Sequence, residues 1–322
     1  MTAPGRTSGR PVIRVRGLTM AYGDADVLRG VDLDIHRGEV FALLGPNGAG
    51  KTTTVEILEG FRRRSGGEAS VLGTDPERGG DAWRARIGLV LQSWRDHRRW
   101  RVAELLTHFA AYYPDPRDPA ELLDLVGLTG QAGRQVGRLS GGQRRRLDVA
   151  LGIVGRPELL FLDEPTTGFD PRARHDFHLL VERLARDEGV TVLLTTHDLA
   201  EAERLADRIA MLVGGRIRAC GTPVELAGRA AAQAEVRWTA GDGTPRRERT
   251  QDPSRLVWEL HRHADGPIAG LEVRRPTLED TYLRMVHRQA GDTDEAHGTG
   301  EAGGGDEAGG TDGCAHEEAP AA

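Results

Sequence analysis

Hydrophobic positions follow two different periods in the N-terminal part of the chain. Residues 11–23 and 27–39 alternate apolar with polar side chains, as half-buried strands of an antiparallel sheet do. Residues 38–44 and 87–92 carry continuous apolar runs, which are typical of buried strands, and residues 52–60 have the spacing of a helix. We therefore expect an N-terminal antiparallel β-subdomain, followed by a core in which buried strands alternate with helices.

The middle of the chain changes character from strands to helices. Residues 101–113 and 119–128 have helical patterns, separated by a proline-rich segment. We expect an inserted helical subdomain over about residues 93–157. Apolar strand patterns then return at residues 159–165, 190–196 and 208–215. Because strands that alternate with helices pair in parallel, the predicted fold class is α/β with a mostly parallel core sheet.

Composition divides the chain into four parts. These are a leader (1–10), a main domain (11–228), a small C-terminal accessory domain (229–290) and an acidic tail rich in Gly and Ala (291–322). The tail is of low complexity and is expected to be disordered. Within the accessory domain, the pattern predicts one strand at 234–240 and one short helix at 278–288.

Charge and cysteine content narrow the possible functions. The tail contains nine acidic residues and no Lys or Arg, whereas residues 1–290 carry 43 basic and 40 acidic side chains. This balance gives no indication of nucleic-acid binding. Cys220 and Cys314 lack metal-ligand spacing, so we expect two reduced thiols in the cytosol. No apolar run reaches the roughly 18 residues of a membrane span, so any membrane role requires a partner.

The segment GPNGAGKTTT contains the only lysine of the chain, since the other basic side chains are all arginine. Gly45, Gly50, Lys51 and Thr52 fit the phosphate-binding pattern GxxxxGK[ST], at a predicted strand-to-helix turn. There the first amides of the helix attract an anion. The compact ammonium of Lys51 suits a ring of backbone amides around phosphates better than a planar guanidinium, and the Thr52 hydroxyl suits Mg²⁺.

Two carboxylates follow a buried strand in LLFLDEP. Asp163 ends the apolar run, and Glu164 is the next residue. Open α/β sheets bind ligands at the carboxyl ends of their strands, so Asp163 would complete a Mg²⁺ site and Glu164 would polarise a water molecule. The alternative is a strand that runs into an ordinary polar loop.

The segment LSGGQ predicts a second anion-binding helix terminus. Ser140 is a helix cap, and Gly141 and Gly142 leave the backbone of the first turn bare. A protein with one phosphate loop has no evident need of a second such terminus in the same site.

The phosphate loop, LSGGQ, LFLDEP and TTHD, in this order, resemble the nucleotide-binding subunit of ATP-binding cassette (ABC) transporters over about residues 12–225. The resemblance implies a P-loop ATPase cassette that hydrolyses ATP with Mg²⁺. It also implies that ATP lies between two subunits, the LSGGQ helix of one facing the γ-phosphate held by the other. The partner subunit would be a second copy or a homologous ATPase.

The resemblance assigns roles to individual residues. Glu164, His197 and Gln92 correspond to catalytic positions, and Thr52, Gln92 and Asp163 to Mg²⁺ ligands. Tyr22 corresponds to the aromatic that stacks on adenine, although an isolated aromatic is also consistent with core packing. The nucleotide-binding positions are Tyr22, Gly45, Asn47, Gly48, Gly50, Lys51, Thr52, Thr53, Ser140, Gly141, Gly142, Gln143 and Asp170. Phe169 replaces the usual aliphatic residue before Asp170.

Residues 274–288 resemble the extension of drug-resistance exporters of the daunorubicin and doxorubicin type, which pair with ABC-2-type permeases. This resemblance implies a cytoplasmic ATPase held on the inner face of the membrane by a separate permease, docked in a groove lined by parts of residues 93–113. The alternative is a soluble ABC ATPase that acts on nucleic acid or the ribosome. Such relatives usually carry two cassettes or a long coiled coil, and this chain has one phosphate loop and no heptad run.

Several charged or histidine-containing segments have simple interpretations. The arginine clusters at 62–64, 97–101 and 144–146 are expected to be solvated faces. His175 and His178, at helical spacing, are expected to be an exposed pair and not metal ligands. The same expectation applies to His261 and His263.

Overall fold

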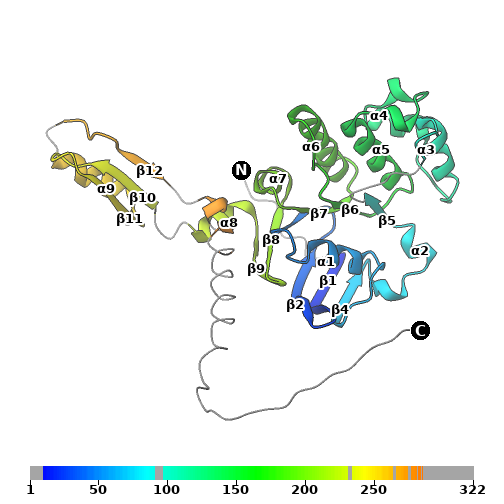
Figure 1. Ribbon diagram of the computed structural model, residues 1–322, viewed down its shortest axis with the longest axis horizontal. Helices are drawn as coiled ribbons and strands as arrows, with labels where there is room; N and C mark the ends of the chain where they lie inside the picture. The colour runs from blue at the N-terminus through cyan, green and yellow to red at the C-terminus, as the bar shows by residue number, and fades with distance from the viewer. Residues whose placement is uncertain are drawn as a thin grey trace, which may run out of the picture.

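The computed structural model describes residues 10–285 except 91–96, 231–233, 264–265, 275–276, 281 and 284. The predicted N-terminal β-subdomain is present (Figure 1) as an antiparallel sheet of order β2-β1-β4. Its strands are β1 (Ile13–Tyr22), β2 (Ala25–Ile35) and β4 (Gly66–Val71). Burial alternates at the start of β1 and at the end of β2, as the sequence predicts, and register shifts interrupt the alternation after Val15.

The core sheet has the order β5-β6-β7-β3-β8-β9, in which all neighbours are parallel except β8 and β9. Its strands are β3 (Val40–Leu44), β5 (Ile87–Val90), β6 (Leu159–Asp163), β7 (Thr191–Thr196), β8 (Arg208–Val213) and β9 (Arg216–Gly221). Every residue of β3, β6 and β7 is buried. The prediction of an α/β fold with a mostly parallel core sheet is therefore confirmed.

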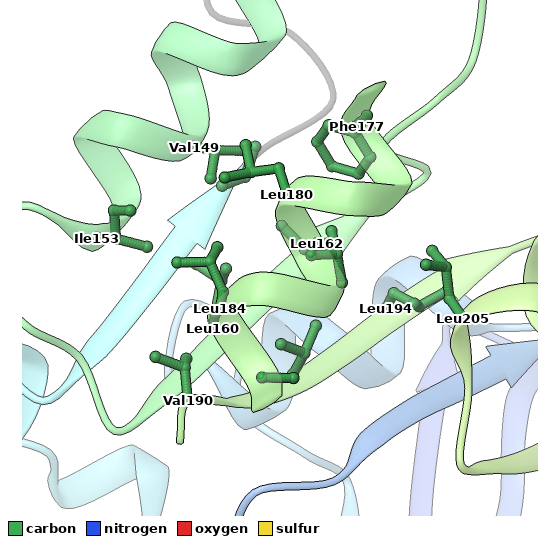
Figure 2. Packing of buried hydrophobic residues seen from close by; sticks show 14 of the residues in the cluster. Val149, Ile153, Leu160, Leu162, Phe177, Leu180, Leu184, Val190, Leu194 and Leu205 are labelled. Atoms are coloured by element: carbon green, nitrogen blue, oxygen red, sulfur yellow. The ribbon is translucent and has the colours of Figure 1, made fainter. Parts of the chain in front are cut away.

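Helices cover the core sheet on both faces. On one face Leu160 and Leu162 of β6 pack with α5 (Gly141–Ile153) and α6 (Pro171–Arg186), as Figure 2 shows. On the other face Leu159 and Phe161 join a second core with α1 (Lys51–Leu58) and the β-subdomain. The remaining helices of the main domain are α2 (Asp81–Arg84), α3 (Val102–Ala110), α4 (Pro119–Leu125), α7 (Leu199–Leu205) and α8 (Pro223–Ala230), with short 3-10 turns at Pro76–Arg78, Thr129–Gln131 and Val136–Arg138.

Helices α3, α4 and α5 form the predicted helical insertion between β5 and β6 (Figure 1). Asp118 caps α4 through the amides of Ala120 and Glu121, with a proline at the first helical position, as the PDPRDP segment suggests. Among the described residues, no helix is both long and apolar enough to cross a membrane.

The C-terminal extension contains more structure than the sequence pattern predicts. The expected strand is β10 (Ala234–Thr239), which lies between β11 (Pro245–Thr250) and β12 (Glu272–Arg274), with α9 (Pro253–Arg262) against it. The described residues between 278 and 285 are helical, and Leu278 is buried in the same core cluster as β6. The expectations for a leader and for a disordered tail fall almost wholly on residues outside the described ranges.

A comparison of two leucines, the buried Leu162 and the exposed Leu179, tests this description of the core. Leu162 is 1% exposed on the interior strand β6, and Leu179 is 47% exposed on α6. Leu162→Ala leaves a cavity and is expected to lower the free energy of unfolding by about 2–5 kcal/mol, whereas Leu179→Ala is expected to lower it by less than about 1 kcal/mol. Urea unfolding followed by tryptophan fluorescence measures both. Equal losses would contradict the assignment of β6 to the centre of the core.

Candidate functional site

The loop between β3 and α1 has a backbone that only glycine can form. Gly48 and Gly50 have φ angles of 79° and 102°, in the left-handed region. A Cβ on Gly45 would lie 2.4 Å from the Leu212 carbonyl oxygen, and one on Gly50 would lie 2.6 Å from a methyl group of Leu28. The glycines thus let the loop close tightly over the sheet edge and turn its amides toward the start of α1.

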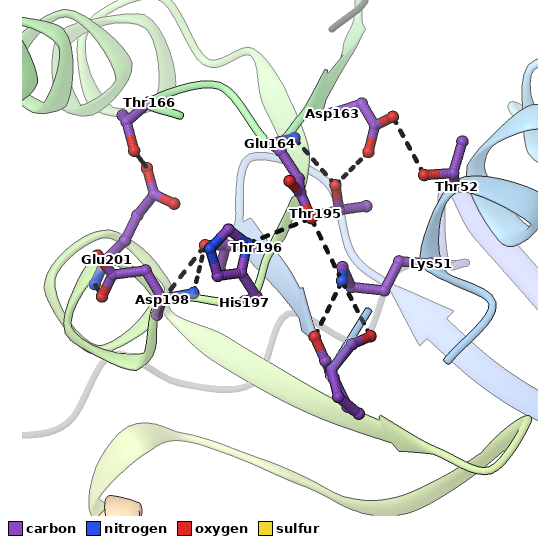
Figure 3. A network of polar contacts seen from close by, with 12 residues as sticks. Lys51, Thr52, Asp163, Glu164, Thr166, Thr195, Thr196, His197, Asp198 and Glu201 are labelled. Atoms are coloured by element: carbon purple, nitrogen blue, oxygen red, sulfur yellow. Dashed lines mark hydrogen bonds and ion pairs between the residues drawn. The ribbon is translucent and has the colours of Figure 1, made fainter. Parts of the chain in front are cut away.

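Lys51 is 5% exposed and lies at the centre of this loop. Its Nζ donates to the carbonyl oxygens of Gly45 (2.9 Å) and Pro46 (3.2 Å), and lies 3.3 Å from Oε1 of Glu164 (Figure 3). The lysine therefore joins the loop after β3 to the carboxylate that follows β6. A planar guanidinium does not have the shape to replace these three contacts.

Asp163, at the end of β6, is held through both carboxylate oxygens. Thr52 donates its hydroxyl to Oδ2 at 3.3 Å, and Thr195 of β7 donates its hydroxyl to Oδ1 (Figure 3). The two parallel strands β6 and β7 and the helix α1 thus place one carboxylate and two hydroxyl groups at the same edge of the sheet. These are hard oxygen donors of the kind that Mg²⁺ prefers.

Glu164 adopts an unusual backbone conformation, with φ of 43°. Its amide donates to the backbone oxygen of Thr195 at 3.2 Å and to the Thr195 hydroxyl at 3.1 Å, which hold this conformation. Its side chain is only 14% exposed, and Oε1 lies 3.3 Å from Nδ1 of His197 as well as from Lys51. A backbone conformation as unusual as that of Glu164 is commonly found at functional sites, where surrounding contacts maintain it.

The LSGGQ segment forms the N terminus of α5. The Ser140 hydroxyl accepts a hydrogen bond from the Gln143 amide, and the Gln143 side chain accepts one from the Ser140 amide. A Cβ on Gly142 would lie 2.9 Å from that of Ala173 in α6, so the glycine allows the two helices to approach closely. Asp170 caps α6 by accepting from the Ala173 amide. Ser140 and Gly141 are themselves exposed.

The other predicted site residues lie in different surroundings. Tyr22 is 42% exposed, with the Arg62 guanidinium 5.1 Å from its ring centroid, so it is not part of the core. Asn47 is exposed at the tip of the phosphate loop, and Thr53 is half-buried in the first turn of α1. Gln92 lies outside the described residues.

Phe169, the residue that departs from the usual pattern, is partly buried against the core and packs edge-on against Phe177 with 5.9 Å between ring centroids. The aromatic ring of Phe169 therefore packs between α6 and the core of the main domain.

Two expectations of exposure are wrong. Arg145, in the middle of the cluster at 144–146, is buried because it faces the sheet, where it donates to the carbonyl oxygens of Pro165 (3.0 Å) and Asp163 (3.0 Å). Burial lowers the pKa of its guanidinium, while Asp148 and Asp163 act in the opposite direction. His178 is also buried, 3.7 Å from Glu201, because it lies on the core-facing side of α6 beside Phe177.

Arg145 and Thr195 are the residues of the site that the sequence pattern did not identify. Arg145 connects the LSGGQ helix to the backbone on both sides of Glu164, and Thr195 contacts Asp163 and Glu164 together. The only sequence signal for Thr195 is its place two residues before His197, at the end of an apolar run.

Known proteins have similar sequences and folds. A family described as ABC transporter matches residues 28–167. A fluoroquinolones export ATP-binding protein of Mycobacterium tuberculosis is 44% identical over 222 residues, covering 68% of this chain and 73% of the relative. Daunorubicin resistance ATP-binding protein DrrA2 of Streptomyces coeruleorubidus is 36% identical over 314 residues, covering 88% of this chain and 97% of the relative.

Among solved structures, cbiO1 of Clostridium perfringens, part of the ABC transporter complex cbiONQ, is similar with a TM-score of 0.62 and 27% identity. The similarity covers 68% of this chain and 92% of that one. With a relative 36% identical over nearly its whole length, the chain belongs to the family of ABC transporter ATP-binding proteins.

Proposed function

We propose that this chain is the ATP-hydrolysing subunit of an exporter and that it works as a dimer with a separate ABC-2-type permease. The observation that carries the proposal is the position of the Glu164 carboxylate, 3.3 Å from both Lys51 and His197 at the end of β6. The export and drug-resistance names of the relatives described above support export over a soluble ATPase acting on nucleic acid or the ribosome.

The phosphates of ATP would bind at the N terminus of α1, where Gly48 is exposed and the buried Gly45 and Gly50 let the loop pack closely. Lys51 would exchange the carbonyl oxygens of Gly45 and Pro46 for phosphate oxygens, because a buried ammonium gains more from an anion than from neutral acceptors. Asn47, Thr52 and Thr53, in the loop and first turn of the helix, would add contacts, and exposed Tyr22 would stack on adenine.

Movement of Lys51 toward phosphate would free the Glu164 carboxylate. Glu164 would then accept a proton from water while the water oxygen forms a bond to the γ-phosphorus and the bond from that phosphorus to the β-phosphate oxygen breaks. The products are ADP and inorganic phosphate. His197, 50% exposed and 3.3 Å from Glu164, would donate from its ring to the γ-phosphate.

Thr52 and Asp163 would hold Mg²⁺, because their oxygen atoms already lie together at the sheet edge. The ion would supply positive charge that offsets the charge developing on the phosphate oxygens. Gln92 is expected to be a third ligand on the basis of the resemblance alone.

A second subunit would complete each site. The start of α5, where Ser140 and Gly141 are exposed, would contact the γ-phosphate bound by the partner through Ser140, Gly141, Gly142 and Gln143, and Asp170 would link the two sites. ATP would then stabilise only the closed dimer, and its binding would shift the population toward closure.

The permease would dock in a groove between the core and the helical subdomain and hold the chain at the inner face of the membrane. The groove has a volume of about 450 Å³ and is lined by the end of α1, by β5, and by α3 and α5. Phe109 and Tyr113 contribute to it from the region in which the sequence predicts docking.

Glu164→Gln tests the proposed reaction. The amide keeps the size of the side chain but cannot accept a proton, so the rate of phosphate release is expected to fall by at least about 100-fold, while ATP binding and ATP-dependent dimerisation remain. Phosphate release and size-exclusion chromatography with ATP measure these effects. Glu203→Gln, at an exposed position of α7, is the matched control. An unchanged rate in Glu164→Gln would contradict the role assigned to this carboxylate.

Arg145→Met tests whether the buried arginine positions the carboxylates. Loss of its hydrogen bonds leaves the Pro165 and Asp163 carbonyl oxygens without these donors and is expected to lower the free energy of unfolding by about 2 kcal/mol. We also expect kcat to fall by about tenfold with little change in KM for ATP. Arg145→Lys should restore part of kcat. Arg146→Met, which loses bonds to residues 126 and 127 away from the site, is the control; equal kcat losses in the two methionine variants would exclude positioning.

A further inference from the structure

The groove between the core and the helical subdomain, here called the subdomain groove, has two glycines at its base. A Cβ on Gly88 of β5 would lie 2.2 Å from the carbonyl oxygen of Gly152 in α5. The two glycines therefore allow helix α5 to lie directly on the strand. The walls are largely apolar and include Phe61, Leu89, Phe109, Tyr113 and Leu151. Phe61 is 66% exposed.

Two carboxyl groups interrupt this apolar lining. Glu59 follows the last residue of α1 and is only 4% exposed, and Asp148 lies two turns into α5. Neither side chain has a hydrogen bond or ion pair within the part of the chain that the structure describes. Arg84, which also lines the groove, pairs with Asp81 at 3.2 Å. Among the described residues, the groove thus contains two acids that no cation contacts directly, although Arg144 and Arg145 are near enough to act on Asp148.

Burial disfavours the ionised forms of both acids. Burial raises the pKa of Glu59 to about 8, and the charges of Asp163 and Glu56 act in the same direction. Burial raises the pKa of Asp148 to about 6, although Arg145 and Arg144 lower it. An incoming ammonium or guanidinium would replace the protons and convert both acids into ion-pair partners.

We propose that the subdomain groove binds a cytoplasmic segment of the permease in which one Lys or Arg, flanked by apolar side chains, pairs with Glu59 and Asp148. The inference rests on the proposed function and adds the chemistry by which the partner is recognised. Apolar side chains of that segment would cover Phe61, Leu89 and Leu151, and its single cation would determine the register of binding.

The same cation would connect the two helices that the nucleotide contacts. Helix α1 begins at the phosphate loop and ends at Glu59, and α5 begins at Ser140 and passes Asp148. A side chain held by both carboxylates would therefore respond to any change in the distance between these helices. This provides a direct physical link between nucleotide binding and the permease.

Photo-crosslinking from Phe61 tests the proposal. The full-length chain with Phe61→p-benzoylphenylalanine is expressed in its native host, its membranes are irradiated, and the crosslinked peptide is identified by mass spectrometry. We expect a cytoplasmic segment of a multi-spanning membrane protein that contains Lys or Arg between apolar residues. The double variant Glu59→Gln with Asp148→Asn should reduce the crosslink at least tenfold, whereas Glu203→Gln should not.

The acids also predict the pH dependence of docking. Because a cation favours their ionised forms, the crosslink from position 61 with both acids intact is expected to strengthen from pH 6 to about pH 8 and then level off. This measurement remains informative if the double variant does not fold, which thermal melting would reveal. Because burial disfavours the ionised form of Glu59 in the folded chain, replacing it by the neutral amide in Glu59→Gln should not lower Tm at pH 9.

Other outcomes separate the two proposals. A crosslinked permease segment without a basic residue, or a full-strength crosslink in the folded double variant, would overturn the acid-pair recognition and leave the transporter function in place. Crosslinking only to soluble proteins, to ribosomal components or to a second copy of this chain would contradict both the recognition and the proposed function.

Discussion

The contact of Glu164 with Lys51 and His197 is the constraint on which the rest of the site depends. It requires the phosphate loop, the end of β6 and the end of β7 to meet at one edge of the sheet. The parallel order β6-β7-β3 brings these ends together, because parallel strands all present their carboxyl ends at the same edge. The strained φ of Glu164, held by two bonds to Thr195, then turns its side chain toward the lysine.

A buried arginine and a glycine connect the site to the helical subdomain. Arg145 connects α5 to the backbone beside Glu164, and Gly152 allows the same helix to lie against β5. The position of α5 is therefore determined by the sheet edge that holds Glu164 at one end and by the floor of the subdomain groove at the other. A single helix thus carries the LSGGQ terminus, the contact with the backbone beside Glu164 and one of the two acids of the groove.

Much of this arrangement was predictable from the sequence, and the exceptions have physical reasons. The spacing of apolar residues predicts the strands because this spacing reflects which side chains are buried. It does not indicate which residue of an arginine triplet faces the sheet, so it predicts a solvated Arg145. It also does not indicate which face of a helix packs on the core, so the prediction of an exposed His178 is wrong. Strand β11 was missed because pairing with β10, and not burial of its largely charged side chains, determines its position. The roles of the predicted site residues still rest on family resemblance and on the geometry.

In the proposed reaction, Lys51 leaves its carbonyl partners for phosphate and so releases Glu164. A crystal structure of the Glu164→Gln chain with ATP and Mg²⁺ would show where the lysine lies. We expect Nζ of Lys51 to contact the β- and γ-phosphates, with Ser140 of a second copy on the γ-phosphate. A bound nucleotide with Lys51 still on the carbonyl oxygens of Gly45 and Pro46 would exclude this release of Glu164.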